Sequence, residues 1–305
     1  MKKITFGGVF KESARIFRLH FKTIIVLVLL VMIPVGVITG ISELVLLKNE
    51  SVNVFLDVFS NSESSQNEIY ESFYGAAPSL VPFLLVMLLV SMLTLLLPAA
   101  VSRLTLDEGR RGLLSRSRAD EEMNVVHSDD FDLQQTSTAT QYFTGALKML
   151  PKIAACTLLG AVFAALGFII MFLPGLIIAV IAGLSCYFAA LTGQTFFKGL
   201  LGTGGAVVKR PLMFVMYLVS SAATLFTTFI VGLLLALIPL SGTAGIIGSV
   251  VITTVTLLIS SLVSAFGSIA VSCYMINALD NSGYKRKENG FMEKEVVKRE
   301  NPFQQ

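Results

Sequence analysis

Charged residues are scarce in this chain: they make up 14% of its 305 residues, whereas hydrophobic residues make up 54%. Soluble domains carry about 25% charged residues. This shortage excludes an ordinary soluble domain as the main body and indicates a polytopic membrane protein with a limited soluble part. We expect the lipid bilayer as its main partner and no nucleic-acid partner.

Cysteine is also rare, and no Cys-x-x-Cys pair occurs. Cys156, Cys186 and Cys273 all lie inside apolar stretches. Cysteines in such surroundings behave as small packing residues. A disulfide framework and a metal site built on thiolates are therefore not expected.

The chain has only two histidines, His20 and His127. His20 has no cysteine or carboxylate partner at ligand spacing, so metal binding is not expected there. His127 is close to Asp129 and Asp130 in a segment without signs of a rigid scaffold. Catalysis needs positioned groups, so a solvated loop is favoured over a catalytic dyad. We predict no enzyme activity and no cofactor.

Long apolar runs without any charged residue make up much of the chain. The longest central one, from Ile153 to Phe197, is flanked by Lys152 and Lys198 and contains Pro174-Gly175 near its middle. About 20 apolar helical residues cross a bilayer. This run therefore predicts two crossings that turn at Pro174-Gly175 and have both ends on one side.

Similar runs predict two further hairpins. Thr23 to Leu47 and Ser79 to Leu104 form the first, and Leu212 to Leu279, with a turn at Pro239 to Gly242, forms the last. We therefore predict an all-α membrane protein with six transmembrane helices in three hairpins and a short amphipathic N-terminal interfacial helix. Its expected parts are an interfacial segment (1–22), the first hairpin (23–104) with an external loop (48–78), a cytoplasmic loop (105–152), two hairpins (153–279) and a cytoplasmic tail (280–305).

The N-terminal segment has an apolar and a basic stripe at helical spacing. The apolar stripe comprises Phe6, Phe10, Ala14, Phe17 and Phe21, and the basic stripe comprises Lys11, Arg15, Arg18 and Lys22. This pattern favours a helix in the membrane interface whose cations contact anionic lipids. The alternative is a polar lead-in to the first crossing. The segment is too long for a cleaved signal peptide.

The remaining hydrophilic segments lack strong periodicity. Residues 105–141 are interpreted mostly as a mobile loop, in which Arg110 and Arg111 are further candidates for anionic-lipid contact. Gly202 to Gly205 resembles a phosphate-binding loop but lacks the following Lys and Ser/Thr, so flexibility is favoured there. The tail after Asp280 has no apparent apolar anchor and is expected to fray.

The distribution of charge predicts the topology. With the N-terminus inside, Lys48 is the only one of the 23 Lys and Arg residues that lies outside. Cytoplasmic loops carry the excess of Lys and Arg, so both termini are expected in the cytoplasm. The three hairpins share one plan, which indicates either a parallel threefold repeat or merely a bundle with basic inner loops.

Small residues recur at every fourth position in the last two crossings. They are Ser220, Thr224, Thr228 and Gly232 in the fifth and Thr256, Ser260, Ser264 and Ser268 in the sixth. We expect these ridges to pack against other helices, because lipid provides no hydrophobic drive for association. A polar pathway lined by hydroxyls is the alternative, but crossings two to six contain no Asp, Glu, Lys, Arg or His apart from Arg103 at the inner end of the second.

One resemblance covers nearly the whole chain. Leu150-Pro151-Lys152, Pro174-Gly175, Lys209-Arg210 and the N-terminal VFKESARIFRLHFKTIIVLVLL resemble the YciC-like family of bacterial inner-membrane proteins. The chain is also similar to the membrane region of some glycerophosphoryl diester phosphodiesterases, although it has no phosphodiesterase barrel. The resemblance implies a six-helix integral protein and no catalytic residues.

We therefore expect a multi-pass protein of the bacterial inner membrane that acts as a non-enzymatic accessory or scaffold factor of the envelope. A small permease component or a lipid-handling protein is the alternative. An enzyme acting on lipids would need clustered polar groups at the interface, for which His20 with the 105–141 segment is the candidate.

Overall fold

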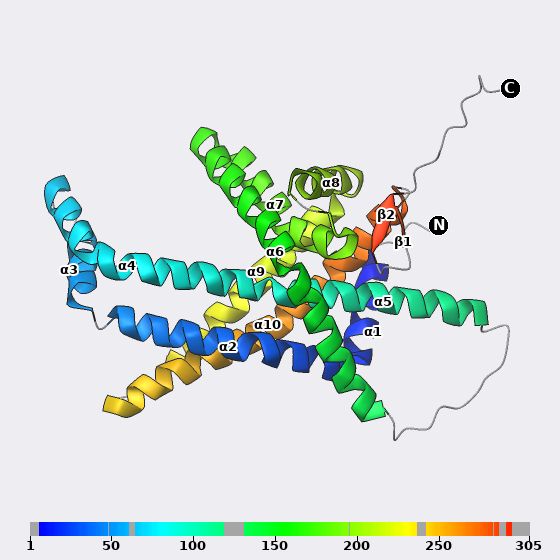
Figure 1. Cartoon of the computed structure of the whole chain (residues 1–305), viewed down its shortest axis with the longest axis horizontal. Coiled ribbons are helices and arrows are strands. Elements are labelled where there is room, and N and C mark those ends of the chain that lie inside the picture. Colours follow the sequence, from blue (N-terminus) through cyan, green and yellow to red (C-terminus); the bar gives the residue numbers. More distant parts are fainter. Residues whose placement is uncertain are drawn as a thin grey trace.

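The computed structural model describes residues 6–47, 49–60, 65–118, 131–194, 196–236, 242–282, 284–286 and 291–294. Within these residues the chain forms helices almost throughout, followed by one small β-hairpin (Figure 1). The elements are α1 (Phe6–Leu19), α2 (Phe21–Leu47), α3 (Glu50–Ser60), α4 (Gln66–Thr94), α5 (Leu96–Arg118), α6 (Phe131–Ile170), α7 (Phe172–Thr192), α8 (Phe196–Lys209), α9 (Leu212–Ala236), α10 (Gly242–Asp280), β1 (Tyr284–Arg286) and β2 (Met292–Lys294).

Among the residues that the structure describes, six helical segments are long and apolar enough to cross a membrane. They are Phe21–Leu46, Gln66–Glu108, Ala139–Ile170, Phe172–Thr192, Leu212–Leu234 and Gly248–Asp280. A helix satisfies its own backbone hydrogen bonds, which is what a lipid environment requires. The prediction of an all-α membrane fold with six such helices is confirmed.

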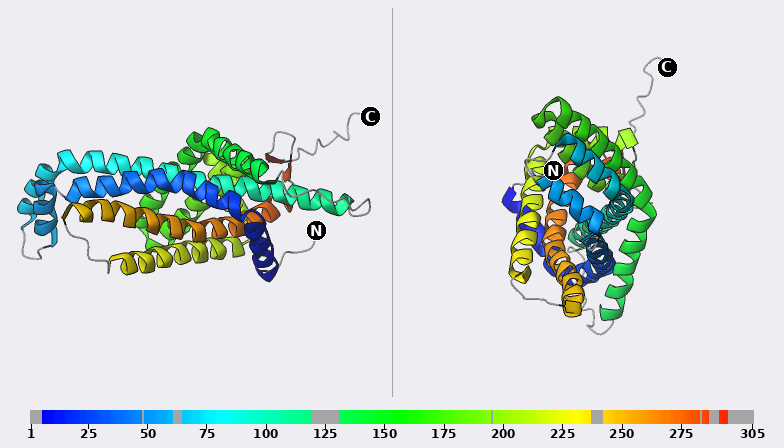
Figure 2. Two further views of the ribbon diagram at one scale, coloured as in Figure 1. Left: turned by 90° about the horizontal axis from the view of Figure 1, so that it is seen from below. Right: turned by 90° about the vertical axis from the view of Figure 1, so that its left-hand side faces the viewer.

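The helices form one elongated bundle. In Figure 2, α2, α4, α9 and α10 run along its length, and Figure 1 shows the α6–α7 hairpin crossing it obliquely. The α1 end, which we define by α1 and the β-hairpin, lies opposite the α3 end. The buried core concentrates where α5, α7 and α10 meet, and includes Leu97, Leu104, Leu184, Phe188, Ile269 and Met275.

Glycines set the closest approach between α2 and α10. A Cβ atom at Gly36 would lie 2.8 Å from the Cα of Thr254, and one at Gly40 would lie 3.0 Å from the Cα of Val250. Any side chain at these positions would push the helices apart. This close backbone approach is the packing that a Gly-xxx-Gly pair permits in lipid.

The predicted turn of the central hairpin is three residues too late. Met171 has an extended backbone and separates α6 from α7, and its N–H donates to the Gly167 carbonyl at 2.9 Å. Pro174 lies in the first turn of α7, where a missing N–H costs no helical hydrogen bond. Gly175 instead permits contact with α6, because a Cβ there would overlap Phe168.

Two predicted loops contain helices. The expected external loop (48–78) forms α3 and the start of α4, whose N-terminus is capped by Ser65 and Glu68 in a reciprocal capping box. The Val52 side chain of α3 is fully buried. The rings of Phe55 on α3 and Phe73 on α4 are in contact, with their centroids 5.7 Å apart. These contacts stabilise a short helix within the connection that is expected to be external.

The segment 105–141 was also predicted to be mostly a mobile loop. Residues 105–118 instead continue α5 and residues 131–141 begin α6, while 119–130 lie outside the described residues. Thr105 and Leu106 are buried on α5, and Ala139 is buried on α6. Packing between the two helices therefore extends both of them beyond their apolar runs.

The glycine-rich segment after Phe197 is helical as well, so the interpretation as a flexible connection was wrong. It forms α8, in which Gly202 lies directly on the ring of Phe188 and Gly199 lies beside Cys156. These glycines allow α8 to pack closely on α6 and α7. Thr203 of the same helix is fully buried.

The prediction that the tail after Asp280 has no apolar anchor is wrong, because a β-hairpin in this tail packs on the bundle. Strands β1 and β2 pair in antiparallel register, and Met292 is 2% exposed. The Phe291 ring lies against Gly193, which has φ +69°, and the Arg103 guanidinium lies 4.9 Å from the ring centroid. Cation–π and apolar contacts thus hold this hairpin on the α1 end of the bundle; residues 295–305 lie outside the described residues.

Candidate functional site

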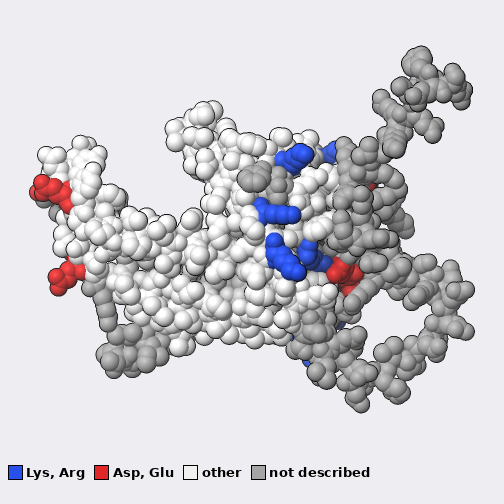
Figure 3. Space-filling view, viewed as in Figure 1, with Lys and Arg blue, Asp and Glu red and all other residues white. Residues whose placement is uncertain are grey.

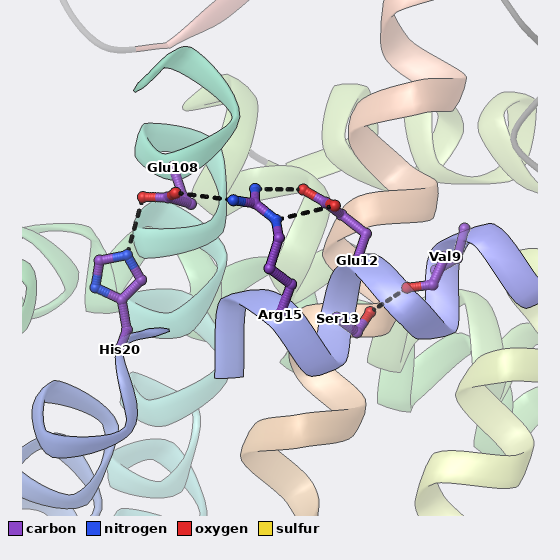
Figure 4. Close-up of polar contacts among 6 residues, drawn as sticks. All are labelled: Val9, Glu12, Ser13, Arg15, His20 and Glu108. Carbon is purple, nitrogen blue, oxygen red and sulfur yellow. Dashed lines mark hydrogen bonds and ion pairs between the residues drawn. The ribbon is translucent and has the colours of Figure 1, made fainter. Parts of the chain in front are cut away.

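A group of ionisable side chains at the α1 end forms the candidate site, which we call the charge cluster. It consists of Glu12 and Arg15 on α1, His20 between α1 and α2, and Glu108 on α5 (Figure 4). Three ion pairs belong to this cluster: Arg15–Glu12, Arg15–Glu108 and His20–Glu108. It joins the N-terminal helix to the body of the bundle.

Local structure positions each member. Glu12 and Arg15 are three residues apart on α1, and such residues face the same side of a helix. His20 breaks the helical run as a turn, which redirects the chain from α1 into α2. Glu108 follows Leu97, Val101 and Leu104 on the buried face of α5.

The charges alternate along the cluster. The Arg15 guanidinium lies between two carboxylates: it donates to both oxygens of Glu12, at 2.6 and 3.1 Å, and its Nη1 lies 3.7 Å from Oε1 of Glu108. Nε2 of His20 lies 2.9 Å from Oε2 of Glu108. The hydrogen bonds that Arg15 donates to Glu12 raise the pKa of the Arg15 guanidinium. Arg15 is therefore paired with two carboxylates, and Glu108 contacts both Arg15 and His20.

The four side chains of the charge cluster differ in burial. The side chains of Glu12 and Arg15 are each 47% exposed, that of His20 is 13% exposed and that of Glu108 is 7% exposed. A buried carboxylate without partners is very unfavourable. Glu108 is therefore the member whose contacts matter most for stability.

The cluster contains half of a nucleophile-activating arrangement. A carboxylate that orients a histidine is found in hydrolytic triads, but a nucleophile must also lie within hydrogen-bond reach of the histidine. Ser13 is the hydroxyl on α1, and it donates to the Val9 carbonyl at 2.8 Å, away from His20 in Figure 4. Within the described residues, the geometry favours an ion-paired joint over a catalytic centre.

The predicted lipid-contacting cations occupy two situations. Lys11, Arg18 and Lys22 are exposed at the α1 end, whereas Arg15 is part of the charge cluster. Arg110 and Arg111 lie on α5, but their side chains are outside the described part of the structure. The structure therefore adds an internal role for Arg15 that its place in a basic stripe did not indicate.

Part of the apolar stripe of α1 also faces protein. Phe10 and Phe17 make edge-on contacts with Phe266 of α10, with ring centroids 5.4 and 5.6 Å apart. Val9 and Ile16 are buried beside this stripe. The helix is thus packed on the bundle on one side and exposed at its basic residues.

The small-residue ridges differ between α9 and α10. On α10, Thr256, Ser260 and Ser268 are buried and Ser264 is half-buried, and on α9, Ser220, Thr224 and Thr228 are half-buried. Ser220 meets Gly267 of α10 in close contact. Gly232 does not pack as predicted, because a Cβ there would meet nothing within 4 Å. Its side of α9 faces away from neighbouring helices.

Hydroxyl groups of α10 bond to two other helices. Ser268 Oγ lies 3.1 Å from the Tyr187 hydroxyl of α7, and Ser272 donates to Ser102 of α5 at 2.9 Å. These contacts join the three helices of the core. Hydroxyl pairs of this kind stabilise helix association in lipid.

The partner of His20 was the main feature that the sequence interpretation missed. That partner is Glu108, which lies 88 positions from His20 in a segment interpreted as a loop. The spacing of Leu97, Val101, Leu104 and Glu108 could have indicated that Glu108 shares a buried helix face. The described residues contain no group of three or more His, Cys, Asp or Glu side chains that could hold a metal.

Comparisons with known proteins give no assignment: no protein-family model, no curated protein and no solved structure matches the chain.

Proposed function

We propose that this multi-pass protein is a non-enzymatic accessory or scaffold factor of the bacterial cytoplasmic membrane. It acts through contacts of its helices with lipids and with a protein partner. The α1 end faces the cytoplasm, because this orientation puts every Lys and Arg except Lys48 on the cytoplasmic side.

The charge cluster is the observation that carries this proposal. Its members pair with one another and fix α1 to α5, so their charges serve to hold a helix in place. A helix fixed in this way presents a constant surface with exposed cations at Lys11 and Arg18. Such a surface suits docking to anionic headgroups or to a partner better than it suits catalysis.

The resemblance to the YciC-like family supports the same location. The Leu150-Pro151-Lys152 and Pro174-Gly175 sequences that carry it lie on α6 and α7. Neither sequence contributes a group to the charge cluster. The N-terminal sequence, which also carries the resemblance, contains Glu12, Arg15 and His20 of the cluster.

The test is purification of the full chain in native-lipid nanodiscs, with mass spectrometry of the bound proteins and lipids. A scaffold should retain one protein in stoichiometric amount. A Glu108→Ala variant, which lacks the ion pairs between α5 and the α1 segment, should bind that protein more weakly, whereas a Gly75→Ala variant should keep it because a Cβ at Gly75 meets nothing within 4 Å. Recovery of no protein in stoichiometric amount with the wild-type chain would contradict the proposal.

A permease or lipid-handling function is the second candidate. The hydroxyls of Thr39 on α2 and Thr256 on α10 are buried and have no hydrogen-bond partner among the described residues. Both lie in helices that pack against each other at Gly36 and Gly40. A small molecule that copurifies with the wild-type chain and is lost from a Thr256→Val variant would favour this function.

A further inference from the structure

The chain contains a long region that is basic without any compensating acid. Between Asp132 and Asp280 the sequence has no carboxylate side chain, but it has Lys148, Lys152, Lys198, Lys209 and Arg210. The two hairpins in this region therefore cannot neutralise their own cations. Any carboxylate or phosphate that pairs with these cations has to come from another part of the chain or from a ligand.

Three of these lysines lie on neighbouring turns of two helices in contact. Lys148 and Lys152 are four residues apart on α6 and so share one face. Gly199, next to Lys198 on α8, packs beside Cys156, one turn further along α6. Figure 3 shows several Lys and Arg side chains gathered on one face of the molecule, with an acidic patch beside them.

The three lysines are available to a ligand. All are exposed, and none makes an ion pair or a hydrogen bond with the part of the chain that the structure describes. Glu108 on the adjacent helix α5 is occupied by Arg15 and His20. The lysines thus differ from Arg15, whose charge is met within the protein.

Exposed apolar side chains stand beside these cations. On α8, Phe197 is 58% exposed and directly precedes Lys198. Leu201, three residues after Lys198, is 75% exposed. On α6, Leu147 is 45% exposed beside Lys148. A surface with this mixture suits an amphiphile, since long lysine side chains can reach polar headgroups while apolar neighbours contact acyl chains.

We propose that Lys148, Lys152 and Lys198 bind the phosphate of an anionic phospholipid headgroup, with an acyl chain along Phe197 and Leu201. Membrane orientation alone needs only an excess of cations in this region. A headgroup site requires these three lysines together, on α6 and α8. The site adds to the scaffold function and does not depend on it.

Native mass spectrometry of the full chain in detergent tests the site by titration with phosphatidylglycerol and, in parallel, phosphatidylcholine. Each lysine near an anionic surface contributes about a fivefold gain in affinity. The K148Q/K152Q/K198Q variant should therefore bind phosphatidylglycerol about a hundredfold more weakly. Binding of phosphatidylcholine should not change.

Two variants make the result decisive. K148R/K152R/K198R keeps the charges and should bind like the wild type, whereas K287Q/K294Q/K298Q removes three cations from the tail and should have little effect. Equal binding of the two lipids by the wild type would overturn the proposal. Equal losses in the α6–α8 and tail variants, or displacement of the lipid by excess inorganic phosphate, would also overturn it.

Discussion

The charge cluster makes a quantitative prediction about the attachment of α1. Replacing Glu108 by Gln keeps the shape of the side chain but removes the charge that faces Arg15 and His20. Breaking a buried ion pair from one side costs about 3–5 kcal/mol. The Arg15 side chain is 47% exposed and can regain water, so we expect a smaller cost of about 2 kcal/mol for holding α1 in place.

Hydrogen exchange of the α1 amides measures this cost directly. Every 1.4 kcal/mol is tenfold in an equilibrium constant, so α1 should exchange about thirtyfold faster in Glu108→Gln. Amides of α7, which lies in the core, should change much less.

Glu12→Gln is the matched control, because it removes a carboxylate from the same arginine at an exposed site. An exposed pair contributes at most about 1 kcal/mol, so the exchange of α1 should accelerate about fivefold or less. If Glu108→Gln and Glu12→Gln had the same effect, burial of Glu108 would not be what fixes α1, and the reasoning would be refuted.

Three further outcomes are expected. Gly36→Leu should destabilise the fold by about 1–3 kcal/mol in reversible detergent unfolding, because the side chain has no room against α10, whereas Gly75→Ala should be nearly neutral. Phe291→Ala should speed proteolytic removal of the tail several-fold in limited digestion, because the cation–π contact that anchors it is lost. In cells, an impermeant maleimide should label a Ser60→Cys variant, and should label Ser282→Cys only after permeabilisation; the reverse pattern would exclude the proposed orientation.

The membrane-spanning segments could be predicted because a single property decides them. A run such as Ile153 to Phe197 needs only length and the absence of charge to be assigned to the bilayer. The exact turn could not be predicted in the same way. Pro174 is equally compatible with a turn and with the first turn of a helix, and packing of Gly175 on α6 selects the second.

The short helices depend on contacts that no local pattern contains. The glycines of α8 lower its intrinsic helix propensity, yet they are what lets Phe188 and Cys156 approach the backbone. Similarly, His20 and Glu108 meet only because the junction of α1 and α2 lies beside α5 at this end of the bundle. Tertiary packing, which the sequence does not display locally, determines both features.

The turn between α6 and α7 also affects how the protein enters a membrane. From Phe168 to Leu173 it contains only apolar side chains, so no hydrophilic segment has to be carried across the hydrocarbon when this hairpin inserts. The segment between α2 and α4 carries Glu50 and Asp57, and in the proposed orientation it has to be translocated. In that orientation the first hairpin inserts only with transfer of a polar segment across the hydrocarbon, whereas the central hairpin can insert by partitioning from one side.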